Sequence, residues 1–376
     1  MPSDDRKQIL HAISSLDVGG VERWLVEVLR NIDRNRFHVD VMSRKAGVYD
    51  DEVRALGCNI HYCGSPRNPL RYLRRFNEIL REFGPYDFIH SYTVYGSLET
   101  YLAARAGVPN RVLHNQNARI PLHKKKIGWA AYRYLMEYLA RTYATHILAV
   151  SELSAVALLG RQLLSDPRYR WVPQAIDLQE FHSPVDRAQV RDELGIPVDA
   201  PVVGHVGRFA KVKNHDYLVD IAAELLMRKS NVMVLLVGDG PDLPVIQEKT
   251  RRLGIEDNFV FAGVRHDVPK LMLGAMDALV FPSKSEGLPR VVLEAQAAGL
   301  PCVLSDVIAH EVDVVTPFIR RHSIQDSPSV WADTLRDLLE AGPPVSQAEA
   351  FSAMEASYFN IQENVKLLQE IYSASP

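Results

Sequence analysis

Residues 285–301 read SEGLPRVVLEAQAAGLP, and this stretch decides the fold that we expect. The residues before it, 278–281, read ALVF and have the apolar density of a buried strand. Pro282 ends that strand because proline cannot donate a hydrogen bond to a sheet ladder. Pro289 suits the first turn of a helix, and Gly299 is a typical stop. The stretch therefore predicts a buried strand that feeds the N-terminus of a helix.

A helix start of this kind is a suitable place for an anion. Its first N–H groups are free and the helix dipole is positive there, and Gly287 allows the backbone to approach a ligand. Glu286 precedes the helix and Glu294 lies within it, so two carboxylates flank the anion position. They would repel a phosphate beside them but would accept hydrogen bonds from hydroxyls on either side of a diphosphate. The alternative is an ordinary first-turn acid followed by an exposed helix glutamate.

Apolar runs and helical patterns alternate along the rest of the chain, which argues for parallel sheets covered on both faces by helices. Ligands bind such sheets at the carboxyl ends of the strands. Proline and polar residues at 182–184 mark a linker, so we expect two α/β domains. The main strand candidates are 8–14, 38–42, 59–62, 87–90, 111–114, 146–151, 170–173, 201–207, 232–237 and 259–265.

Several residues at predicted strand ends are candidate ligand contacts. Arg208 and Lys213 follow one strand and would neutralise a diphosphate, although two surface cations near a turn are an equally ordinary finding. His90 and His114 end two other strands, where a histidine is either a ligand contact or a hydrogen-bonded structural residue. The turn 238–240, Gly-Asp-Gly, is interpreted as a surface turn.

In this order, the motifs resemble those of the retaining GT-B glycosyltransferases of family four. The segment 308–313 lacks the glycine-rich turns of many members, which places the chain closest to the capsular and exopolysaccharide branch. The resemblance implies two Rossmann-like doubly wound domains with an interdomain cleft. Residues 1–182 would form the acceptor-side domain, completed by a helix within 357–376, and residues 183–356 would bind the nucleotide-sugar donor.

The resemblance also implies roles for individual residues. Glu286 would contact hydroxyls of the donor sugar and Glu294 the nucleotide ribose, Arg208 and Lys213 would bind the diphosphate, and His114 would face the donor sugar. The remaining donor-binding residues that it implies are Gly19 and Gly20, in a glycine loop that closes over the diphosphate, Val264 and Arg265, whose backbone holds the base, and Gly287, Leu288, Pro289 and Arg290.

The expected reaction is transfer of a sugar from a nucleotide diphosphate donor, with retention of configuration. The favoured donor is a UDP-sugar, and the acceptor is a glycan, a lipid-linked or a small-molecule glycoconjugate. We expect no cofactor beyond the nucleotide sugar and no metal, because no D-x-D motif is evident and two cations with a helix terminus can replace a divalent ion. A nucleotide-sugar epimerase of the same fold is the alternative. A bilobal sugar-binding protein is a weaker one, which the lack of an export signal disfavours.

Composition bounds these expectations. The chain has 376 residues, 47% of them hydrophobic, and a formal net charge of −3, which suits two ordinary cores and gives no sign of a nucleic-acid partner. The three cysteines form no paired framework, so we expect reduced thiols and a cytoplasmic protein.

Residues 1–180 hold 25 Lys and Arg against 19 Asp and Glu. The run Lys124–Lys126, followed by aromatic residues, suggests peripheral membrane contact, although a packed helix with a charged entrance is the alternative.

Overall fold

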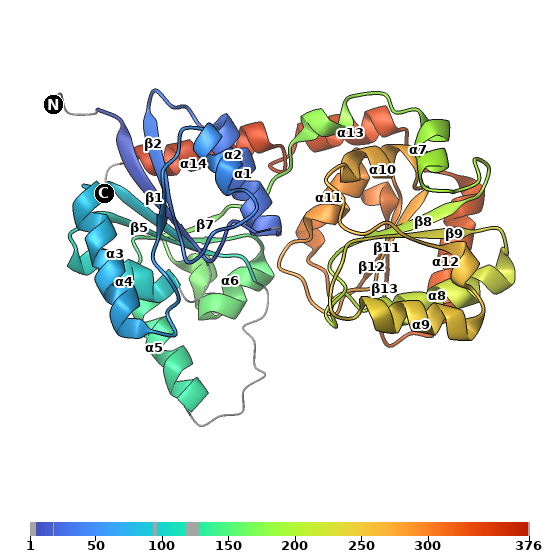
Figure 1. Ribbon diagram of the computed structural model, residues 1–376, viewed down its shortest axis with the longest axis horizontal. Coiled ribbons are helices and arrows are strands. Elements are labelled where there is room, and N and C mark those ends of the chain that lie inside the picture. The colour runs from blue at the N-terminus through green and yellow to red at the C-terminus, as the bar shows by residue number, and fades with distance from the viewer. Residues whose placement is uncertain (1–4, 18, 93–95, 118–127, 375–376) are drawn as a thin grey trace. The chain divides into compact units, whose positions relative to one another are not determined.

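The computed structural model describes residues 5–17, 19–92, 96–117 and 128–374 (Figure 1). The chain divides into two compact units, Met1–Ala175 with Ile361–Pro376, which we call unit 1, and Ile176–Asn360, which we call unit 2. The sequence-based boundary was placed after residue 182, and the returning C-terminal segment was placed from residue 357. The acceptor and donor roles of the two units, and a cleft between them, stay predictions.

Unit 1 is built on a seven-stranded parallel sheet of order β3-β2-β1-β4-β5-β6-β7. Its strands are β1 Lys7–Ile13, β2 Phe37–Ser43, β3 Ile60–Tyr62, β4 Phe88–Tyr92, β5 Asn110–Asn115, β6 His146–Ala149 and β7 Tyr169–Trp171. Its helices are α1 Gly20–Asn31, α2 Asp50–Ala55, α3 Pro69–Phe83, α4 Gly96–Arg105, α5 Gly128–Tyr143, α6 Glu152–Leu159 and α14 Ile361–Ser373, with a short 3₁₀ helix η1 Arg161–Ser165.

Helices cover both faces of this sheet because alternate residues of each strand point to opposite faces. In β1, Ile9 and Ile13 join the core beneath α1, α2 and α14. Leu10 and Ala12 join the core beneath α3 and α4 on the other face. The last helix, α14, is thus part of unit 1, and the Trp24 indole of α1 donates a 2.9 Å hydrogen bond to Asn364 Oδ1 of α14.

Unit 2 is built on a six-stranded parallel sheet of order β10-β9-β8-β11-β12-β13. Its strands are β8 Val202–Val206, β9 Met233–Val237, β10 Phe259–Phe261, β11 Ala278–Phe281, β12 Cys302–Ser305 and β13 Ile319–His322. Its helices are α7 Arg187–Glu193, α8 His215–Arg228, α9 Leu243–Leu253, α10 Val268–Gly274, α11 Arg290–Ala297, α12 Pro328–Ala341 and α13 Gln347–Glu355, with 3₁₀ helices η2 Leu178–Phe181, η3 Glu256–Asn258, η4 His310–Val312 and η5 Thr316–Phe318.

Both sheets are doubly wound, as the sequence predicted. In unit 2 a single core joins the strands to α8, α9 and α12, whereas α10 and α11 lie on the opposite face of the sheet (Figure 1). The strand order reverses between β1 and β4 in unit 1 and between β8 and β11 in unit 2. Connections leave in opposite directions at such a reversal, and the strand ends there form the crevice in which doubly wound sheets bind ligands.

Two further features bear on the predictions. Cys58, Cys63 and Cys302 are all buried free thiols. Within the described ranges, none of the helices combines the length and the apolar character needed to cross a bilayer. The cytoplasmic location stays a prediction.

Candidate active site

The reversal point of unit 2 brings together two residues that are far apart in the sequence. Lys213 lies in the loop between β8 and α8, and Glu286 lies in the loop between β11 and α11. The Lys213 ammonium donates a 2.8 Å hydrogen bond to Glu286 Oε1, and their side chains are only 19% and 14% exposed. The same ammonium lies 4.7 Å from the centre of the Phe281 ring, which favours its positive charge. A cation and a carboxylate therefore form a partly buried ion pair at the strand ends.

Backbone and side-chain hydrogen bonds hold the two loops against each other. The Lys284 N–H donates to the carbonyl of Val212 at 2.8 Å. Asn214 adopts a left-handed backbone, with φ of 61°, and its amide donates to the Pro282 carbonyl at 3.2 Å. Asparagine tolerates this conformation better than most residues. The Lys213–Glu286 pair therefore stands on a fixed framework.

The glycine turn after β9 also forms part of this framework. Gly238 has φ of +136°, and a Cβ there would lie 2.2 Å from the carbonyl oxygen of Gly207. Gly240 has φ of +157°, and its Cβ would lie 2.4 Å from the carbonyl oxygen of Phe209. Only glycine fits such close approaches. Asp239 is exposed and both glycines are partly exposed, so 238–240 is a surface turn as interpreted from the sequence, and it also packs directly against the loop that carries Arg208.

Arg208 is exposed in that loop. Its guanidinium has no hydrogen-bond or ion-pair partner among the residues that the structure describes, in contrast to Lys213. Arginine offers a planar set of donors that matches the geometry of phosphate oxygens. The loop after β8 thus presents Arg208 without a partner among the described residues and Lys213 in an ion pair.

The helix α11 begins directly after the Glu286 loop. Pro289 is its N-cap and provides no side-chain hydrogen bond, so the side chain at the helix start does not satisfy the first N–H groups. Leu288 is buried and Gly287 partly buried, so the loop is packed down onto the domain. Every residue of α11 is buried, and the start of such a helix suits an anion. Binding of the donor at this helix start stays a prediction.

Glu294 lies one turn into α11 and has a charged neighbour. The guanidinium of Arg290 approaches Glu294 Oε1 at 3.8 Å, and the two side chains are 7% and 9% exposed. This distance is an ion pair without a good hydrogen bond. Glu294 therefore keeps acceptor capacity for a hydroxyl group.

The predicted base contacts lie after β10. Val264 is 53% exposed, and Arg265 donates two hydrogen bonds to Asp267, at 2.7 and 2.6 Å. The guanidinium of Arg265 is therefore held within its own turn by Asp267, and a backbone contact with a base stays a prediction. The turn is joined to the glycine turn by the Gly238 N–H, which donates to the Gly263 carbonyl at 2.7 Å.

The predicted glycine loop lies in unit 1. Gly19 is the N-cap of α1 and has an extended backbone, with no side-chain hydrogen bond at the cap. Gly20 is exposed. Glu22, in the first turn of α1, has its pKa raised by burial, and the charge of Asp17 contributes to the same shift. The residue between Asp17 and Gly19 lies outside the described residues.

His114 lies inside the core of unit 1. It is fully buried in β5, its Nε2 is 3.0 Å from the Val172 carbonyl, and its Nδ1 is 3.2 Å from Nε2 of His90. Burial lowers the pKa of His114 to about 3, so the ring is neutral. In this structure both ring nitrogens are in use, and the predicted contact with a donor sugar would require one of these bonds to break. That role stays a prediction.

His114 belongs to a larger network that sequence analysis did not find. Tyr372 of α14 contacts His90 Nδ1 at 2.6 Å, and Tyr92 contacts His11 Nδ1 at 2.6 Å. The rings of His11 and His90 stack with centroids 4.9 Å apart. The positions of His90 and His114 at predicted strand ends indicated part of this network. Tyr372, which bonds His90, lies near the end of the sequence, so no local pattern connects the two residues.

Within the described ranges, no group of three or more His, Cys, Asp and Glu side chains is placed to hold a metal ion.

The fold and the reversal-point site define a class of protein: two doubly wound α/β units with charged residues at the strand ends. Comparison with known proteins narrows this class. A family model described as "Glycosyl transferases group 1" matches residues 186–353, and one described as "Glycosyltransferase Family 4" matches residues 18–180. The chain is 33% identical over 384 residues to a Bacillus subtilis (strain 168) protein described as "Putative glycosyltransferase EpsF", covering 99% of this chain and 98% of that protein.

A second sequence relative and a solved structure are also similar to this chain. A Staphylococcus aureus protein described as "Capsular polysaccharide biosynthesis glycosyltransferase CapH" is 23% identical, covering 97% of this chain and 98% of that protein. The crystal structure of Anabaena HepE in complex with UDP-glucose has a TM-score of 0.82 at 22% identity, covering 97% of this chain and 99% of that chain. The chain belongs to the glycosyltransferase family, and its fold is the GT-B fold.

Proposed function

We propose that the protein is a retaining glycosyltransferase of polysaccharide assembly that moves a sugar from a UDP-sugar to a glycan or lipid-linked glycoconjugate. The Lys213–Glu286 pair at the reversal point of unit 2 carries the proposal. The complex of HepE with UDP-glucose supports the choice of donor, and the EpsF and CapH relatives support the choice of pathway class. Retention rests on the resemblance of the Glu286–Glu294 element to the retaining family.

In the proposed mechanism, the ion pair exchanges partners when the donor binds. Lys213 turns from Glu286 to the diphosphate, and Glu286 then accepts hydrogen bonds from hydroxyls of the donor sugar. Arg208 and the start of α11 contact the same diphosphate. As the bond from the sugar to the phosphate breaks, negative charge grows on the leaving group, and fixed positive charge there lowers the barrier.

The other predicted residues complete this arrangement. Glu294 accepts from the ribose hydroxyls, the backbone at Val264 and Arg265 holds the base, and Gly19 and Gly20 allow the unit 1 backbone to approach the diphosphate. Because two side-chain cations and a helix start supply the positive charge, we propose that transfer needs no divalent ion. Full activity in excess EDTA is the expected result, and activity that EDTA removes and Mg²⁺ or Mn²⁺ restores would refute this part.

We also propose peripheral contact with an anionic membrane through unit 1. Lys124–Lys126 lie outside the described residues, but α5, which follows them, exposes Tyr134 at 74%, Leu135 at 48% and Tyr138 at 52%. Basic and aromatic side chains together suit a membrane interface. Flotation with anionic liposomes should drop when Lys124, Lys125 and Lys126 are changed to Ala, and unchanged flotation would remove this proposal.

The reaction itself is tested with a panel of nucleotide sugars. Calorimetric titration names the donor, and NMR of the product then gives the anomeric configuration. We expect a UDP-sugar to bind and the product to keep the configuration of the donor. Inversion would refute retention, and conversion of the donor sugar to its epimer in the absence of any acceptor would instead assign an epimerase.

A further inference from the structure

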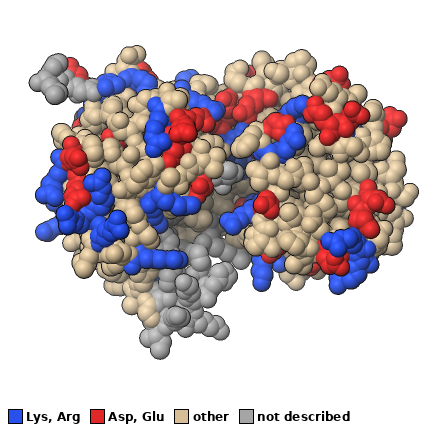
Figure 2. Space-filling view, in the orientation of Figure 1, with Lys and Arg blue, Asp and Glu red and all other residues tan. Residues whose placement is uncertain are grey.

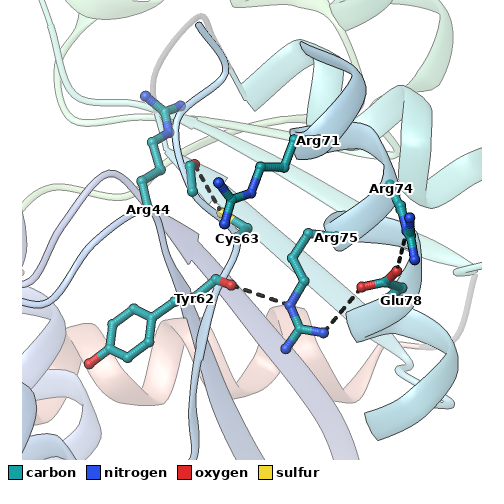
Figure 3. A pocket seen from close by; sticks show the side chains of 8 residues that line it. Arg44, Tyr62, Cys63, Arg71, Arg74, Arg75 and Glu78 are labelled. Carbon is teal, nitrogen blue, oxygen red and sulfur yellow. Dashed lines mark hydrogen bonds and ion pairs between the residues drawn. The ribbon is translucent and has the colours of Figure 1, made fainter. Parts of the chain in front are cut away.

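Unit 1 contains a pocket that the donor site does not use. It has a volume of about 450 Å³ and lies at the carboxyl ends of β2 and β3, beside one face of α3 (Figure 3). Arg44 follows β2, Cys63 follows β3, and Arg71, Arg74, Arg75 and Glu78 come from α3. We call this the arginine pocket. Its volume is within the range of small-molecule sites, and its place at the strand ends suits a ligand.

The helix α3 presents its charges to the pocket because of their spacing. Arg71, Arg74, Arg75 and Glu78 recur at the intervals that place residues on one face of a helix. Tyr72, Phe76, Ile79 and Leu80 form the buried face. Figure 2 shows basic side chains gathered over the region of α3. One side of the helix therefore anchors it to the core, and the other side lines the pocket with positive charge.

The lining has more cations than its carboxylate can neutralise. Glu78 is shared by Arg74, at 2.8 Å, and Arg75, at 3.3 Å. Hydrogen bonds from Arg74 and then Arg75 lower the pKa of Glu78, so the carboxylate is charged. Arg75 has a second acid, Glu82, at 3.7 Å. Neither Glu78 nor Glu82 is paired with Arg44 or Arg71 in the part of the chain that the structure describes.

Neither of these two arginines is well satisfied. Arg71 is exposed, and its guanidinium has no hydrogen bond or ion pair with any residue in the described ranges. The Nε atom of Arg44 is buried without a hydrogen-bond partner, and its Nη2 approaches Glu99 only to 3.7 Å. Glu99 is itself buried and accepts a 2.6 Å hydrogen bond from the Tyr72 hydroxyl. Unpaired donors around a cavity favour an oxyanion that offers several acceptor oxygens.

We propose that the arginine pocket binds a phosphate or diphosphate group carried by the acceptor substrate. Arg71 provides the free donors, and Arg44, Arg74 and Arg75 provide further positive charge around the pocket. The identity of the ligand as acceptor rests on the proposed function, whereas binding of the phosphate group is tested without any transfer. Two sources have this chemistry, a lipid diphosphate and a soluble sugar phosphate.

The test measures binding of inorganic pyrophosphate by calorimetry in the full chain carrying Arg208→Ala and Lys213→Ala, so that the proposed donor site does not contribute. We expect this background to bind pyrophosphate. Adding Arg71→Gln should weaken binding about tenfold or more, since hydrogen bonds to charged groups have this magnitude. Arg81→Gln is the matched control, because Arg81 lies on the same helix outside the pocket and its side chain bonds the Asn77 carbonyl; it should change affinity less than about twofold, as expected for a surface charge.

Three results would overturn the proposal: no pyrophosphate binding in the background protein, unchanged binding in Arg71→Gln, or equal loss in Arg71→Gln and Arg81→Gln. Farnesyl diphosphate and glucose 1-phosphate then distinguish the two sources. The compound that binds more tightly than pyrophosphate shows whether the pocket takes a lipid diphosphate or a soluble sugar phosphate. If Arg71→Gln loses pyrophosphate binding while Lys213→Ala keeps full sugar transfer, the proposed function is refuted and the proposed phosphate pocket is retained.

Discussion

The two sheets reverse their strand order at equivalent places, but the side chains near those places differ in kind. In unit 1, His11 and His90 face each other across β1 and β4, and neutral rings fill a fully buried network. In unit 2, the loops after β8 and β11 place Lys213 against Glu286 in an ion pair that remains partly exposed. The same topology thus serves packing in one unit and charge in the other. A strand-end position alone does not identify a catalytic residue.

The largest expected effect is on the stability of unit 1. Trp24 is fully buried, its ring lies 5.4 Å from that of His114, and its indole bonds Asn364. Trp24→Ala should lower the free energy of unfolding by about 3–5 kcal/mol, because it leaves a cavity and an unpaired acceptor. Urea denaturation measures this change, with Tyr134→Ala on the exposed face of α5 as the control. A loss below about 1 kcal/mol would show that the network is not a packed core.

The next effect concerns pH. Burial lowers the pKa of His11 to about 3. Between pH 3 and 6.5 the unfolded histidine binds a proton that the folded one does not, so its contribution is complete above pH 6.5 and is lost as the pH falls. Each such histidine adds a slope of about 1.4 kcal/mol per pH unit.

His11→Phe should therefore flatten the pH dependence of unfolding relative to the unchanged protein, and His266→Gln, at an exposed position, should not. Urea denaturation at pH 7.5, 6 and 5 gives the three slopes. Parallel curves for His11→Phe and the unchanged protein would mean that His11 is not held neutral by burial.

Substitutions in the Lys213–Glu286 pair of unit 2 should lower the catalytic activity. Lys213→Ala and Glu286→Ala should each lower turnover well over tenfold, a barrier change above about 1.4 kcal/mol, because each removes a group that we place at the leaving diphosphate or the donor sugar. Lys270→Ala is the control, since Lys270 forms a similar 2.9 Å pair with Glu193 on the surface. Steady-state assays with the named donor compare the three variants. Retained turnover in both site variants would sink the assignment.

The smallest effect is expected at Arg265. Its guanidinium is held by Asp267, so Arg265→Ala removes no side-chain contact with the proposed base. The KM for the donor should rise less than about threefold, equivalent to roughly 0.6 kcal/mol. A rise above tenfold would show that the side chain leaves Asp267 and binds the donor.

The sequence predicted the parts of this protein that depend on local pattern. The strand at Ala278–Phe281 and the helix that follows it are where the apolar run, Pro282 and Gly299 placed them. The closeness of Lys213 to Glu286 depends on β8 pairing with β11, which no local pattern encodes. The packing of Gly238 against Gly207 and the hydrogen bond between His90 and Tyr372 likewise depend on tertiary contacts. The basic character of α3 was visible in the sequence, but the pocket beside it also needs Arg44 and Cys63 from two other strand ends.

The proposed function requires that the Lys213–Glu286 site of unit 2 holds the diphosphate of the donor. A crystal structure of the protein with its UDP-sugar tests this most directly. We predict diphosphate oxygens within hydrogen-bond distance of Lys213 and of the first N–H groups of α11, with Glu286 released to the sugar. A donor bound elsewhere, with the Lys213–Glu286 pair intact, would contradict the account.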